Sequence, residues 1–247
     1  MNELKLLKGD SQELKNGLRI YPLTLGEIAD LGEQKYNQYL SVISINKDLL
    51  INALSSPDFS NDEIGEINNL SNLECIIFWG MQDPTIMVSF TESLSTFLKS
   101  EVFIYEEDVV IKNDQGSFIL NSVLFEEVKA VIFRQNFLKD SKSSSFKPAN
   151  SKAKQLMDKL QKVKAKIQKQ NNEEQLGLKD IISIVSAYST DINILTVWNL
   201  TVCQLYETYT RLIIWDEYHN KFTLLPHTSD TSSLDLKHWA TNINKTN

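Results

Sequence analysis

The residues best able to bind a metal ion or act as nucleophiles in this sequence are three histidines and two cysteines. His219, His227 and His238 lie eight and eleven residues apart, whereas two imidazoles that share one ion on a helix lie four residues apart. Cys75 and Cys203 both lie in apolar runs, which predicts two buried thiols that pack as small hydrophobic side chains. One long-range disulfide is the alternative, although so few cysteines are more typical of a reducing cytoplasm. We therefore predict no metal site and no cofactor.

Carboxylates gather at Glu106–Asp108 and between Asp58 and Glu66, and a pair of them could serve as general acid and base. The stretch from Asp58 lacks the alternating aspartates and the glycine of a calcium-binding loop, so it is interpreted as a turn before a helix. Glu106–Asp108 lies between two β-like runs, where a solvated turn is the simpler interpretation. The sequence has no G-x-S-x-G motif, and its glycines lie at least six residues apart, too far for a dinucleotide-binding motif or a P-loop. We therefore predict that the protein is not an enzyme.

The composition is that of a folded protein rich in helices. Hydrophobic residues make up 42% and charged residues 23% of the 247 residues, with only 8 glycines and 5 prolines. The net charge of −7 argues against a surface that binds nucleic acid or anionic membranes as a whole. The segment Met1–Gly9 is too short and too charged for a signal sequence, and no apolar run is long enough to cross a bilayer. We expect a cytoplasmic protein.

Helix-start signals dominate the N-terminal third of the chain. Thr24–Glu27 and Ser71–Glu74 have the hydroxyl and carboxylate spacing of a capping box, in which both side chains satisfy N–H groups at a helix start. The first box predicts one helix over 25–41, and the second predicts a helix over 72–79. Another helix is expected after Asp83-Pro84, because proline is tolerated in a first turn. The first 80 residues are therefore predicted to be helical.

The pattern changes to β-branched and aromatic residues over 102–120. Short runs of this kind, separated by turn residues, predict a small antiparallel meander. A helix that Asn121 caps is expected to follow and to end near Phe137. The predicted fold class is mainly α with a small antiparallel β-meander, an α+β protein with a helical N-terminal part and a helical C-terminal part.

A stretch over 139–150 is rich in serine and poor in apolar residues, which predicts a linker. It divides a helical domain, 1–138, from a helical C-terminal region, 151–247. That region begins with a predicted amphipathic helix over 151–170. Residues 139–170 contain ten lysines and two aspartates, so this part of an acidic chain carries a local charge of +8.

The lysines of the predicted basic helix are candidate contacts for a partner, among them Lys152, Lys159, Lys162 and Lys166. They could dock on the acidic remainder of the chain, on a second copy or on an acidic partner protein. Nucleic acid is the disfavoured alternative, because the segment has no arginine and the helix has no aromatic residue to stack on a base. We therefore predict protein partners, with self-association among the options, and no membrane.

Two more helices are expected in the C-terminal region. One covers 178–187, and the other spans at least Leu195–Trp215, where apolar residues recur every three or four positions. Trp198 and Tyr209 fall on that apolar line and are interpreted as core. Aromatic residues off the line are candidates for partner binding, since Trp and Tyr dominate interface hot spots: Tyr206, Tyr218 and Trp239.

Three patches of sequence carry a family resemblance: residues 21–40, which begin Tyr-Pro-Leu-Thr-Leu-Gly-Glu-Ile; residues 148–153; and residues 198–206 with the later His238-Trp239. In the kinds of residues they contain and in their order along the chain, these patches resemble tail-module proteins of phages and prophages of low-GC Gram-positive bacteria. The tail assembly chaperones are the nearest group. The resemblance implies a non-enzymatic protein of the host cytoplasm that binds the helical tape-measure protein and releases it as tube subunits polymerise. A structural tail or baseplate component of the virion is the alternative.

Overall fold

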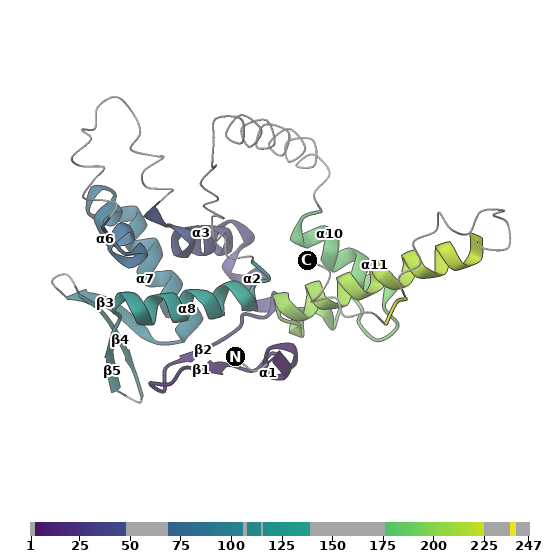
Figure 1. Cartoon of the computed structure of the whole chain (residues 1–247), viewed down its shortest axis with the longest axis horizontal. Coiled ribbons are helices and arrows are strands. Elements are labelled where there is room, and N and C mark those ends of the chain that lie inside the picture. The colour runs from purple at the N-terminus through teal and green to yellow at the C-terminus, as the bar shows by residue number, and fades with distance from the viewer. Residues whose placement is uncertain are drawn as a thin grey trace, which may run out of the picture. The chain divides into compact units, whose positions relative to one another are not determined.

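The computed structural model describes residues 3–47, 69–105, 108–114, 116–138, 176–224 and 238–240 (Figure 1). The chain divides into two compact units. Unit 1 contains Met1–Lys139 and Leu195–Glu207, and unit 2 contains Asp140–Ile194 and Thr208–Asn247. The predicted linker and basic helix lie outside the described residues, so the proposed domain division stays a prediction.

The predicted fold class is confirmed: the described chain is mainly helical, with two small antiparallel sheets. The helices of unit 1 are α1 (Glu3–Lys8), α2 (Leu25–Leu31), α3 (Glu33–Ser44), α6 (Asn72–Gln82), α7 (Pro84–Leu98), α8 (Ser122–Gln135) and the 3-10 turn η1 (Val197–Asn199). Its strands are β1 (Gln12–Glu13), β2 (Arg19–Ile20), β3 (Glu101–Tyr105), β4 (Asp108–Asn113) and β5 (Gly116–Ile119). Unit 2 contains α10 (Leu178–Tyr188), and α11 (Val202–Leu224) begins in unit 1 and continues into unit 2.

A hairpin near the N-terminus corrects the prediction that the first 80 residues are helical. Strands β1 and β2 pair antiparallel, with Gln12 opposite Ile20. The turn between them uses Asn16-Gly17: the Asn16 side chain accepts from the Leu18 N–H, and Gly17 has a φ of 88°. Asparagine followed by glycine is a strong hairpin signal because both tolerate positive φ, and the sequence reading overlooked it.

Both predicted capping boxes are present, but the helix predicted over 25–41 is two helices. Thr24 accepts from the Glu27 N–H while the Glu27 carboxylate accepts from the Thr24 N–H, and Ser71 and Glu74 form the same reciprocal pair. Gly32 has a φ of 90° and separates α2 from α3. A side chain is strained at such a φ, so this glycine permits the break in the helix.

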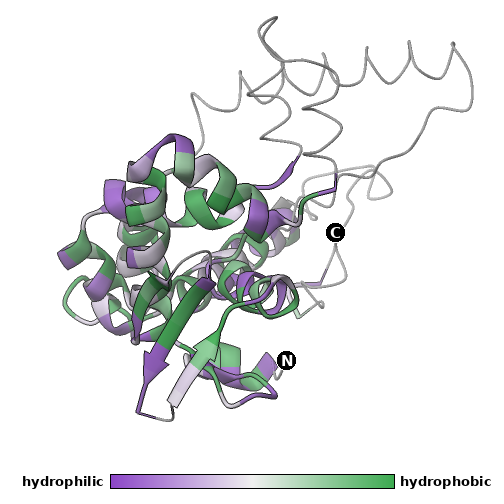
Figure 2. Ribbon diagram, turned by 90° about the vertical axis from the view of Figure 1, so that its left-hand side faces the viewer, coloured by the Kyte–Doolittle hydropathy of each residue, from purple (hydrophilic) through white to green (hydrophobic). Residues whose placement is uncertain are grey.

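Helix α7 lies at the centre of the packing in unit 1, where it contacts α3, α6, β2 and β3. Phe90, Leu94 and Phe97 are fully buried on it, as its apolar spacing predicts. Phe90 meets Phe125 of α8 edge to face, with ring centroids 5.8 Å apart. Figure 2 shows hydrophobic and hydrophilic residues sharing each helix, as expected where one side of a helix is buried and the other is exposed.

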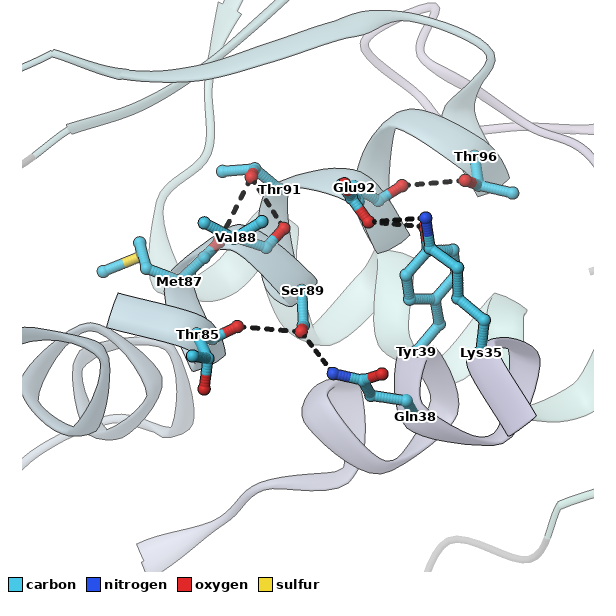
Figure 3. Close-up of polar contacts among 10 residues, drawn as sticks. All are labelled: Lys35, Gln38, Tyr39, Thr85, Met87, Val88, Ser89, Thr91, Glu92 and Thr96. Carbon is cyan, nitrogen blue, oxygen red and sulfur yellow. Dashed lines mark hydrogen bonds and ion pairs between the residues drawn. The ribbon is translucent and has the colours of Figure 1, made fainter. Parts of the chain in front are cut away.

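Polar contacts also join α3 to α7 (Figure 3). Tyr39 donates a 2.8 Å hydrogen bond to Glu92, and the Lys35 ammonium lies 3.0 Å from the same carboxylate oxygen. One turn away, Gln38 donates to the Ser89 hydroxyl at 2.7 Å. The Lys35 and Tyr39 contacts lower the pKa of Glu92. These bonds fix how α3 lies against α7.

Exchanging Glu92 for glutamine should reveal the pH dependence of this contact. A carboxyl whose pKa is lowered by folding stabilises the protein above its unfolded pKa, and this contribution is lost as the pH falls through the folded pKa. Because Lys35 and Glu92 are about half exposed, we expect Glu92→Gln to lower the free energy of unfolding by at most about 1 kcal/mol at neutral pH. The free energies of unfolding of the two proteins, measured by urea titration, should become equal in acid. If the difference in free energy were as large in acid as at neutral pH, the lowered pKa of Glu92 would have no role.

Both cysteines are buried, as predicted, and neither forms a disulfide. Burial raises the pKa of Cys203 to about 11 and also raises that of Cys75. Thiol reagents attack the thiolate, so Cys203 in the folded protein should react about a hundredfold more slowly than an ordinary thiol at mildly alkaline pH. Titration with Ellman's reagent should find two thiols after denaturation and only slow reaction before it. Rapid labelling of the folded protein would contradict this burial.

The segment 195–207 returns to unit 1 and corrects two further predictions. The helix predicted from Leu195 begins only at Val202, after the η1 turn. Leu195 is 83% exposed and Trp198, predicted to be core, is 39% exposed. Thr201 and Gln204 form a reciprocal cap, with Gln204 N–H donating to the Thr201 hydroxyl and Thr201 N–H donating to the Gln204 amide oxygen. Helix α11 therefore starts at its own capping signal rather than where the apolar repeat begins.

The start of α11 lies beside the start of α2. Thr24 and Thr201 form an antiparallel bridge, and the Leu25 N–H donates to the Leu200 carbonyl at 2.8 Å. The chain approaches closely here, because a Cβ on Gly26 would lie 3.2 Å from the Trp198 carbonyl oxygen. Two helix starts that are distant in sequence are thereby joined within unit 1.

Candidate protein-binding groove

Helices α10 and α11 form the described framework of unit 2. Gly177 is the N-cap of α10, and its N–H donates to the Asp180 carboxylate at 2.9 Å. Ile181, Ile182 and Val185 are buried, as the sequence predicts. Helix α11 is 23 residues long, so the part from Thr208 onward supplies about four and a half turns to unit 2.

An open groove with a volume of about 510 Å³ runs along these two helices. Its apolar wall combines Ile184 of α10 with Tyr209, Leu212 and Ile213 of α11. Ile213 is 45% exposed, so part of this branched aliphatic side chain is accessible to a partner. The remaining lining residues are polar or amphipathic: Tyr188, Asp216, Glu217, Asn220 and Lys221.

The polar side of the groove is held in place by hydrogen bonds. The Tyr188 hydroxyl donates to one oxygen of Asp216 at 2.7 Å, and Asn220 donates to the other at 3.0 Å. Lys221 forms an ion pair with Glu217 one turn earlier, at 2.6 Å. The hydrogen bond to Asp216 raises the pKa of Tyr188. The groove thus has an apolar wall bordered by ordered polar groups, the arrangement typical of a surface that takes up the apolar side of a helix.

A second stripe of α11 carries stacked aromatic rings. Trp215 lies 4.0 Å from His219 between ring centroids, and Tyr218 contacts His219 and His238 at 5.6 and 5.2 Å. Arg211 donates to the Trp239 carbonyl at 3.3 Å. Tyr218 is about two and a half turns from Tyr209, so these two side chains lie on opposite sides of α11. Trp215 of the stripe, however, packs against Tyr188 of the groove, with ring centroids 6.3 Å apart. The histidines here pack against rings, and the described residues contain no group of three or more metal-binding side chains.

The structure separates the predicted partner-binding residues into three places. Tyr218 and Trp239 lie in the aromatic stripe of unit 2, where Trp239 is 45% exposed. Tyr206 is in unit 1 and stacks on Phe137, with ring centroids 5.3 Å apart. The four lysines lie outside the described residues: Lys152, Lys159, Lys162 and Lys166.

Sequence reasoning missed the groove itself. Tyr209 was interpreted as core, and neither Ile213 nor Ile184 was given a role. A signal for the groove is the set of positions 209, 212, 213, 216 and 220, which share one side of a helix. No helix in the described part of the chain is both long enough and apolar enough to span a membrane.

Comparison with known proteins gives one family match. Residues 167–244 match the model described as the YomV second domain, and YomV is a Bacillus prophage protein. Neither a curated protein nor a solved structure matches the chain. The matched range includes α10, all of α11 and residues 238–240, so it contains both the groove and the aromatic stripe. The chain, in less than half of its length, is thus similar to the second domain of a phage-derived protein.

Proposed function

We propose that this chain is a phage morphogenesis protein that works by binding another protein and catalyses no reaction. The observation that carries the proposal is the groove of α10 and α11, which exposes aliphatic surface inside the region similar to a prophage protein domain. A helix that binds with its apolar side in such a groove removes that side from water, which stabilises the complex. The polar groups at the border of the groove set the position of the helix along it.

The partner we propose is the tape-measure protein of the tail that is being assembled. This protein is long and helical, and before it is enclosed in the tail tube it must keep apolar helix faces from aggregating. The family resemblance of the sequence implies this partner, and a groove sized for one face of a helix is compatible with it. In this proposal the chain is a tail assembly chaperone that acts in the host cell and is released as the tube polymerises.

Two measurements test the proposal, one on purified proteins and one on virions. In the first, the purified full-length chain should bind purified tape-measure protein reversibly in solution. In the second, quantitative mass spectrometry of virions purified from the phage that encodes the chain should find the tape-measure protein but not this chain. A stoichiometric copy number in the virion would contradict the chaperone and assign the chain to the structural tail or baseplate components. Failure of the two purified proteins to bind would reject the tape-measure protein as partner.

A further inference from the structure

The three-stranded sheet of unit 1 exposes an apolar row that crosses all of its strands. Phe103 of β3, Val110 of β4 and Ile119 of β5 are directly paired positions, so their side chains stand on one face. Phe103 is 43% exposed and Ile119 is 59% exposed, with Val110 between them partly buried, whereas Val109 and Ile111 on the other face are buried. Contiguous apolar surface of this kind marks an interaction site.

Two charges of opposite sign flank this row on β4, one on each side of Val110. On β4, Asp108 lies two residues before Val110 and Lys112 lies two residues after it, on the same face. Lys112 is paired with Glu101 of β3, and Asp108 is paired with Tyr105. One end of the face therefore presents Lys112 and Glu101, and the other end presents Asp108 and Tyr105.

We propose that this sheet face binds the same face of a second copy of the chain. A two-fold axis that lies between the sheets, passes over Val110 and runs perpendicular to the strands brings each Lys112 over the second copy's Asp108. The same operation brings each Glu101 over a Tyr105 hydroxyl, which can donate to it. Each apolar residue of the row then lies over the same residue of the second copy: Phe103, Val110 and Ile119. Two sheets packed face to face, with their strands nearly aligned, are a standard arrangement.

The alternation of charge favours a copy of this chain over an unrelated protein as the occupant. An isologous interface requires a patch that is complementary to itself after a two-fold rotation. Here the rotation exchanges an acidic position with a basic one around an apolar centre, so both ion pairs form at once. If the axis ran parallel to the strands, lysine would lie over lysine and aspartate over aspartate, and both contacts would be repulsive. The charges thus select one of the two face-to-face orientations.

Reciprocal charge exchanges test this interface in the full chain. In Asp108→Lys the facing pairs become lysine over lysine, and in Lys112→Asp they become aspartate over aspartate. Each single variant should dimerise at least about tenfold more weakly than the natural protein. The double variant Asp108→Lys with Lys112→Asp should dimerise as the natural protein does, because the pairs are restored with their signs reversed. An equimolar mixture of the two single variants should form a mixed dimer, since all facing charges are then opposite.

Sedimentation velocity over a range of concentrations, with one variant fluorescently labelled for the mixture, measures these equilibria. Lys179→Asp on α10 changes the net charge as Lys112→Asp does and should leave dimerisation unchanged. Circular dichroism establishes that each variant is folded.

A natural protein that is monomeric at every concentration overturns the proposal, and so does a dimer that is insensitive to the single exchanges. A mixture that associates no better than its components also overturns it. None of these results depends on binding of the tape-measure protein, so this inference and the proposed function can fail separately.

Discussion

Exchanging Ile213 for aspartate is expected to weaken binding of the tape-measure protein by about thirtyfold or more. Ile213 lines the groove beside Leu212, and loss of a buried anchor at the centre of an interface costs about 2 kcal/mol or more. The exchange also places a third carboxylate beside Asp216 and Glu217. Because Ile213 is 45% exposed in the unbound chain, the fold should tolerate the change. Isothermal titration calorimetry with purified partner measures the effect.

A matched control separates the groove from general effects of a new charge. Ile194 is also in unit 2 and is 54% exposed, but it is not among the residues that line the groove. Ile194→Asp therefore makes the same chemical change at similar exposure and should alter the affinity less than threefold, about the scale of a neutral surface exchange. Equal loss of affinity in both variants would contradict a binding site in the groove.

The largest effect on stability is expected for Phe90→Ala in α7. Phe90 is fully buried and meets Phe125 of α8 edge to face, so its removal leaves a cavity between these helices. Truncating a buried phenylalanine lowers the free energy of unfolding by about 3–5 kcal/mol. This is a large part of the roughly 5–15 kcal/mol by which a typical domain is stable, and a large shift of the unfolding midpoint in guanidinium should be visible by circular dichroism.

Val88 provides the control on the same helix. It lies two residues earlier and is 55% exposed, so Val88→Ala should change the free energy of unfolding by no more than about 0.5 kcal/mol. If Phe90→Ala were as mild as Val88→Ala, α7 would not be the centre of the packing in unit 1.

Local signals predicted much of the fold because they act within a few residues. The capping boxes at Thr24 and Ser71, the cap at Asn121 and the alternation over 102–120 all depend on neighbouring positions. The three helices begin, and the meander forms, where these signals predict. The Asn16-Gly17 turn is equally local and could have been predicted. The break at Gly32 is harder to predict, because a glycine within a helical pattern is often tolerated.

Tertiary contacts account for the predictions that were wrong. The apolar repeat from Leu195 continues smoothly into α11, yet the bridge between Thr24 and Thr201 holds the chain extended just before Val202. A periodic pattern cannot distinguish a helix from a segment that is fixed by a partner distant in sequence. The capping pair Thr201 and Gln204 was the local signal that places the helix start correctly.

The residues that line the candidate groove could not be predicted, for the same reason. Aromatic residues off the apolar line pointed to Tyr218 and Trp239, which lie in unit 2 and within the matched range but do not line the groove. The aliphatic wall of the groove could not be recognised, because Leu212 and Ile213 have the spacing of ordinary core residues. Only the packing of α10 shows which part of that apolar side is covered and which part stays open.

Hydrogen exchange of the full chain, measured with and without purified tape-measure protein, tests the central claim most directly. If the groove holds a helix of this partner, backbone amides in 182–188 and 209–221 will exchange more slowly in the complex, and amides of β3 to β5 will be unaffected by partner binding. Slower exchange elsewhere in a confirmed complex, with α10 and α11 unchanged, would contradict the claim that this groove is the binding site.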